Sequence, residues 1–106
     1  MTIKNKKKSG AMRFLEALAG ELTLANLLMS IRQGEEMTQV EFSKLLGVSR
    51  QYLCDIEHGR RSVSPKSAAI FAKKLGYSPN QFVRLCLQDL VNRDGLKLKI
   101  DVQDAA

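Results

Sequence analysis

The sequence has few of the residues on which catalytic, metal-binding and disulfide-bonded proteins depend. Its 106 residues include one histidine and two cysteines. Cys54 and Cys86 each lie in an apolar-periodic segment without another cysteine or histidine at metal-ligand spacing, so we interpret both as buried free thiols in a reducing compartment. There is no glycine-rich phosphate loop or nucleophile elbow, and the adjacent Glu35 and Glu36 fall in a predicted loop. We therefore expect no enzymatic activity, no metal and no cofactor.

Long apolar runs are also missing from the sequence. No run reaches the length that a membrane-spanning helix needs. Beyond the basic start MTIKNKKKSG, the charged residues Arg13, Glu16 and Glu21 interrupt what would be the apolar core of a signal peptide. These features predict a cytoplasmic protein that does not associate with membranes.

Positive charge is abundant. The formal net charge is +6 and the pI is about 9.6, in a chain that is 44% hydrophobic and of a length typical of one domain. This excess of positive charge favours a polyanionic partner, most commonly nucleic acid, although many soluble basic proteins have no such partner. Residues 1–10 contain four lysines and predict a flexible basic tail, either an arm along DNA or a solvated tail.

Apolar periodicity predicts a helical domain. Apolar residues recur at helical spacing over residues 11–33, with an interruption at Gly20. A capping box from Thr38 to Glu41 starts the next helix, and Ser49 can cap a third. Two serine–proline pairs give the start signal for two more helices. Counted with their caps, the five predicted helices cover residues 11–33, 38–47, 49–58, 64–76 and 78–92.

The end of the chain changes its period. Within residues 94–106, four apolar residues alternate with charged ones, which predicts a strand: Leu96, Leu98, Ile100 and Val102. A lone strand leaves its backbone unpaired, so we expect it to pair with a second copy across a twofold axis, helped by the broad apolar surface of the last helix. A strand of a different protein, or a flexible tail, are the alternatives. The predicted fold class is all-α: a five-helix domain over residues 11–93 with a C-terminal β-strand for dimerisation.

Residues 38–57 resemble the helix-turn-helix of the phage repressor and Cro family, also called the XRE family. Gln39 stands at the start of the first of the two helices, and the small Ser43 lets the helices approach closely. Gly47 lies in the turn, where a residue that tolerates positive φ is needed. Leu53 takes the buried position of the second helix, which closes with IEHGRR. The resemblance covers about two thirds of the chain. The alternative is a generic helical hairpin in a five-helix bundle.

The resemblance implies that the outer face of the helix at 49–58 enters the major groove. Arg50 would then bind guanine, Gln51 adenine and Asp55 the N4 amino group of cytosine. Other residues would contact the sugar-phosphate backbone. Two of the assigned residues have an alternative interpretation: Arg50 also fits a solvated helix face, and Tyr52 also fits packing within the protein. The implied DNA-binding residues are Gln39, Ser49, Arg50, Gln51, Tyr52, Asp55, His58, Arg60, Arg61 and Lys66. Arg32 and Glu57 stand where the family often holds a structural ion pair.

The function that the resemblance implies is sequence-specific transcription regulation, with repression as the expected outcome. A homodimer would bind double-stranded DNA at two half-sites about one helical turn, roughly 34 Å, apart. The alternative is an antitoxin that represses its own operon and also binds a toxin protein. In that case the terminal strand, or the segment around Phe14, would contact the toxin.

Overall fold

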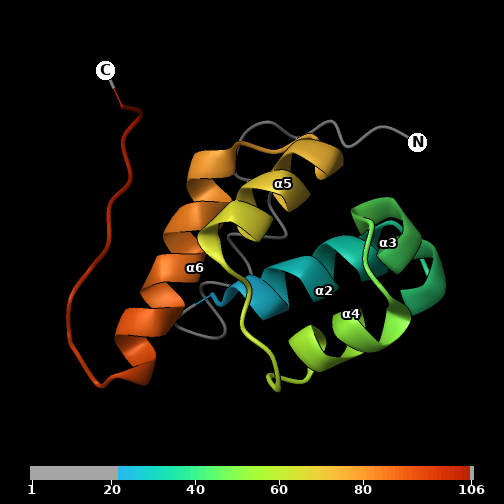
Figure 1. Ribbon diagram of the computed structural model, residues 1–106, viewed down its shortest axis with the longest axis horizontal. Helices are drawn as coiled ribbons and strands as arrows, with labels where there is room; N and C mark the ends of the chain where they lie inside the picture. Colours follow the sequence, from blue (N-terminus) through green and yellow to red (C-terminus); the bar gives the residue numbers. More distant parts are fainter. Residues whose placement is uncertain (1–21, 106) are drawn as a thin grey trace.

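The computed structural model describes residues 22–105 as five helices, which confirms an all-helical domain over this part of the chain. In Figure 1 the helix of residues 24–34 lies between the last helix, residues 79–93, on one side and the helices of residues 39–46 and 50–57 on the other. The predicted basic tail, and the start of the first predicted helix, lie outside the described residues. The helices are α2 (Leu24–Gly34), α3 (Gln39–Leu46), α4 (Arg50–Glu57), α5 (Pro65–Leu75) and α6 (Pro79–Arg93).

Most of these helices begin at the caps that the sequence predicts. The side chains of Thr38, Ser49 and Ser64 each accept a hydrogen bond from the backbone N–H three residues later. The start of the first described helix differs from the prediction. The sequence indicated a helix over residues 11–33 that is interrupted only at Gly20. The structure instead begins α2 at Leu24, where the Thr23 side chain accepts a hydrogen bond from the Asn26 N–H at 3.0 Å.

Apolar side chains from all five helices meet in one core. Among the largest fully buried side chains are Leu28 of α2, Phe42 of α3, Leu53 of α4, Leu75 of α5 and Phe82 of α6. Burying each such side chain contributes roughly 1.5–3 kcal/mol. The core therefore fixes the position of α4, whose eight residues are too few to form a stable helix alone.

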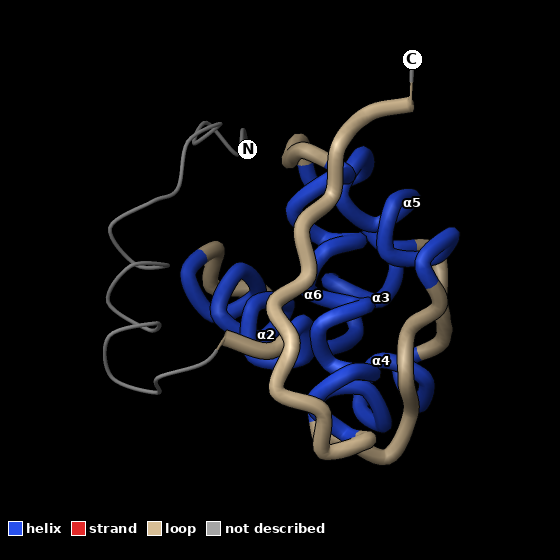
Figure 2. Tube along the Cα trace, turned by 90° about the vertical axis from the view of Figure 1, so that its left-hand side faces the viewer, coloured by secondary structure: helices blue, strands red, loops and turns tan. Residues whose placement is uncertain are grey.

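The C-terminal segment forms no strand pair within the part of the chain that the structure describes. Residues 96–105 form an extended segment that runs back along α6 (Figure 2). The buried side chain of Gln88 on α6 bonds both sides of this segment, donating to the Leu98 carbonyl at 2.8 Å and accepting from the Ile100 N–H at 2.8 Å. A side-chain amide thus takes the place of a neighbouring strand, because the described part of one chain supplies no second strand.

The two cysteines differ in their surroundings. Both are free thiols; Cys86 is buried, but Cys54 is only half-buried, contrary to prediction, because its Sγ lies beside the exposed side chains of His58 and Arg60. Within residues 22–105, no group of histidine, cysteine, aspartate and glutamate side chains is placed to hold a metal ion. No helix in the same range is long and apolar enough to cross a membrane.

Candidate nucleic-acid interface

α3 and α4 form a tight helix–turn–helix pair. Ser43 of α3 is buried, and its hydroxyl donates to the Val40 carbonyl at 2.8 Å, so the buried polar group has a partner. Gly47 ends α3 with a φ of 79°, a left-handed conformation that glycine adopts without strain. Lys74 of α5 reaches this turn and donates from Nζ to the Leu46 carbonyl at 3.1 Å. No local pattern predicts this contact, because its partners are far apart along the chain.

α4 has one buried and one exposed face. Leu53 and Ile56 are at most 1% exposed and hold the helix on the core. Arg50 and Gln51, at the N-terminal end of the helix, are exposed. The Arg50 side chain has no protein partner within residues 22–105, whereas the Ser49 hydroxyl accepts the capping hydrogen bond from the Tyr52 N–H at 3.0 Å. The face that the family resemblance assigns to DNA is therefore open.

Asp55 collects hydrogen bonds on the same exposed face. Its Oδ1 accepts from Gln51 Nε2 at 2.9 Å and from Arg60 Nε at 3.0 Å, and it forms an ion pair with Arg60 Nη2 at 2.9 Å. These bonds, from Arg60 first and Gln51 second, hold the pKa of Asp55 below its ordinary value. The same ion pair raises the pKa of Arg60. Asp55 thus remains a hydrogen-bond acceptor at neutral pH.

The residues after α4 carry several of the predicted phosphate contacts. The guanidinium of Arg61 lies 4.7 Å from the ring centroid of Tyr52, which packs half-buried against the core. The exposed His58 has its Nδ1 2.8 Å from the Cys54 carbonyl oxygen, so a protonated Nδ1 donates there. Lys66 is exposed in the first turn of α5.

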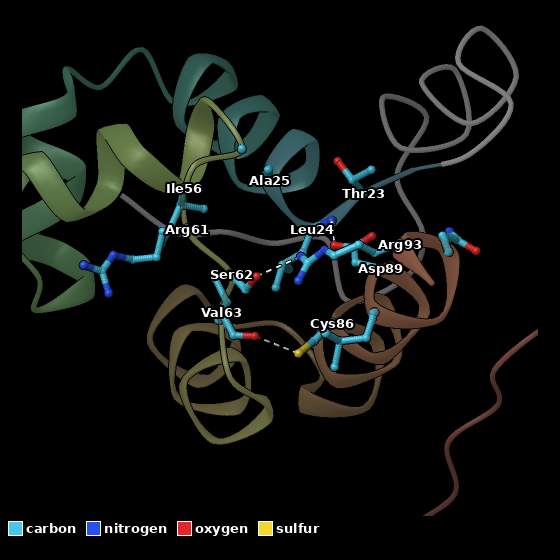
Figure 3. A pocket seen from close by; sticks show the side chains of 13 residues that line it. Thr23, Leu24, Ala25, Ile56, Arg61, Ser62, Val63, Cys86, Asp89 and Arg93 are labelled. Atoms are coloured by element: carbon cyan, nitrogen blue, oxygen red, sulfur yellow. Dashed lines mark hydrogen bonds between the residues drawn. The ribbon is translucent and has the colours of Figure 1, made fainter. Parts of the chain in front are cut away.

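A cavity of about 270 Å³ lies behind this loop, between α6 and the start of α2 (Figure 3). On its walls, Arg93 Nη2 donates to the Ser62 hydroxyl at 2.8 Å, and the Cys86 thiol donates to the Val63 carbonyl at 2.9 Å. Burial raises the pKa of Cys86, which keeps the thiol protonated and able to donate. These bonds fasten the loop to α6, while the Arg61 side chain points away from the cavity.

Beneath the interface, one buried carboxylate connects three helices. Glu57 of α4 accepts from Arg32 of α2 through two bonds, from Nε at 2.7 Å and from Nη2 at 3.1 Å. It also accepts from Gln39 Nε2 of α3 at 2.9 Å. The structure thus brings together the two residues of the expected ion pair. It adds Gln39, which the family resemblance placed at a phosphate and whose amide nitrogen here donates to Glu57.

Two short helices joined at a glycine turn, with a buried inner face and an exposed polar outer face, define a helix-turn-helix unit. A family model described as helix-turn-helix matches residues 28–82, more than half of the chain. The chain therefore belongs to this helix-turn-helix family of XRE-type DNA-binding proteins, and it is a DNA-binding transcription regulator. No curated protein and no solved structure matches the chain.

Proposed function

We propose that this protein is a sequence-specific repressor that binds DNA as a homodimer, with α4 in the major groove. The observation that carries the proposal is the open N-terminal end of α4. Arg50 and Gln51 are exposed there, while Leu53 and Ile56 fix the helix to the core. The N-terminal residues of a recognition helix are the ones that contact base edges. Bound to its operator, such a protein represses by excluding other proteins from the site.

The loop after α4 supports the same orientation. Arg60 and Arg61 are exposed immediately beyond the helix, and Lys66 is exposed at the start of α5. Cations at these positions can neutralise phosphates that flank the groove in which α4 lies. We assign base contacts to Arg50 and Gln51, and phosphate contacts to these three cations.

The extended C-terminal segment supports the homodimer. Leu96 and Leu98 are 50% and 59% exposed, and Leu90 on the neighbouring α6 is 41% exposed. An extended segment with exposed apolar side chains is a site for pairing with another chain. A second copy is the partner that also supplies a second α4, as two DNA half-sites require.

The contacts of Gln88 suggest the register of this pairing. In an extended chain, residues two apart turn their backbone N–H and C=O groups to the same side. Because Leu98 and Ile100 bond Gln88, the backbone groups of Lys99 and Asp101 face the opposite, outer side. Antiparallel pairing centred on Ile100 places Lys99 opposite Asp101 of the second copy, a charge pair worth roughly 0.2–1 kcal/mol.

Selection of bound sequences from a random DNA pool tests the proposed function. We expect an operator of two similar half-sites spaced by about one helical turn. Arg50→Ala should weaken binding to this operator by about 1–3 kcal/mol and relax the preference at one base pair per half-site. Arg61→Ala is the matched control: it should weaken binding to all sequences alike and reduce the dependence of affinity on salt. Failure of the wild-type protein to enrich any sequence would refute the proposal.

A further inference from the structure

Asp55 links the recognition helix to the loop that follows it. Its side chain, which is 22% exposed, accepts from Gln51 one turn earlier and from Arg60 beyond the helix end. Its backbone carbonyl also accepts from the Arg60 N–H at 2.8 Å and the Arg61 N–H at 3.2 Å. One oxygen of the Asp55 carboxylate, Oδ1, is therefore already occupied by donors from Gln51 and Arg60.

The contact with Asp55 decides how the Gln51 amide is oriented. An ionised carboxylate can only accept hydrogen bonds, so the amide nitrogen of Gln51 must face it. The Gln51 carbonyl oxygen then faces away from Asp55, and it has no partner within residues 22–105. The amide nitrogen retains one further N–H. Gln51 thus offers one acceptor and one donor at the exposed end of α4.

One donor and one acceptor side by side match the major-groove edge of adenine. The N6 amino group of adenine donates to such an acceptor, and its N7 accepts from the donor. Guanine presents two acceptors, O6 and N7, and would place its O6 against the Gln51 carbonyl oxygen. The orientation imposed on Gln51 therefore favours adenine over guanine.

We propose that Asp55 is a positioning residue that locks the Gln51 amide for adenine. The inference rests on the proposed function, in which α4 enters the major groove. Asp55 also holds Arg60 against the C-terminal end of α4, beside the expected phosphates. The Asp55 carboxylate thereby couples the contact of Gln51 with a base to the contact of Arg60 with a DNA phosphate.

The test is selection from a random DNA pool with four full-length proteins: wild type, Gln51→Ala, Asp55→Ala and the double variant. The loss of preference in Gln51→Ala identifies the base pair that Gln51 contacts. We expect Asp55→Ala to lower the adenine-over-guanine preference at that same base pair at least about fivefold. The double variant should show no greater loss than Gln51→Ala alone, because both changes remove the same contact.

Asp55→Asn is the matched control, because it removes the charge but keeps an oxygen that can accept from Gln51. It should retain more of the adenine preference than Asp55→Ala, and circular dichroism should show that both variants are folded. Loss of a cytosine preference at another base pair in Asp55→Ala, with the adenine position intact, would overturn the inference. An unchanged preference profile would also overturn it. If wild type selects no sequence, the proposed function itself fails, which is a separate outcome.

Discussion

At the scale of single residues, Glu57 is the side chain on which the position of α4 most depends. Its side chain is 1% exposed and its partner Arg32 is 16% exposed, so solvent screens the pair weakly. A buried carboxylate is tolerated only when it is paired and hydrogen-bonded. Because its partners come from α2 and α3, Glu57 holds the recognition helix in register with both.

We predict that Glu57→Ala lowers the free energy of unfolding by about 3–5 kcal/mol, because it leaves Arg32 charged and unpaired at a largely buried site. Urea denaturation measures this change. Glu57→Gln should have a smaller effect, since its amide oxygen still accepts from Arg32. Glu36→Gln is the control: it changes an exposed residue in the turn after α2 and should alter the free energy of unfolding little. A loss below about 1 kcal/mol in Glu57→Ala would mean that the pair behaves as an exposed one.

At the scale of elements, the turn between α3 and α4 sets the direction of the recognition helix. Gly47 has a φ of 79°, and a Cβ placed on it would lie 2.6 Å from Lys74 Nζ. Gly59 has a similar φ of 75° but open space around it. A side chain at either position would strain the backbone, but only a side chain at Gly47 would also meet Lys74.

We predict that Gly47→Ala and Gly59→Ala each destabilise the fold by about 1–2 kcal/mol through backbone strain. Gly47→Ala should lose about 1 kcal/mol more, because the added methyl group displaces Lys74 from the Leu46 carbonyl. In a Lys74→Ala background this additional loss should disappear, while the effect of Gly59→Ala should stay the same. Urea denaturation of the single and double variants provides the comparison. Equal effects of both glycine substitutions in the wild-type background would contradict the role of Lys74.

At the scale of the whole molecule, the C-terminal segment determines the proposed assembly. We predict that deleting residues 96–106 converts the dimer to a monomer in analytical ultracentrifugation, because the pairing edge is lost. Lys99→Asp should weaken the dimer, since it places two aspartates opposite each other. The exchange variant Lys99→Asp/Asp101→Lys should restore the dimer by restoring opposite charges.

A truncated chain that still sediments as the dimer would exclude the segment as the interface. Loss of the dimer on truncation without recovery in the exchange variant would support the segment but contradict the register centred on Ile100. A mass that corresponds to an additional bound protein after purification from its natural host would favour the antitoxin alternative.

The helix-turn-helix and most of the helix starts follow from the local sequence. These features depend on interactions over three or four residues, such as the Thr38 capping box and the left-handed Gly47, so a local pattern is enough to predict them. The same patterns identified the outer face of α4, because helical spacing separates Leu53 and Ile56 from Arg50 and Gln51.

Which polar groups meet depends on how the helices pack against one another. Gln88 pairs with the extended C-terminal segment, Lys74 bonds the turn after α3, and Gln39 turns toward Glu57. Each of these contacts joins residues that lie ten or more positions apart, and a hydrogen bond depends on distances of a few tenths of an ångström that no spacing rule specifies. For this reason the sequence predicted a strand over the C-terminal segment but not the bonds that hold this segment to Gln88 of α6.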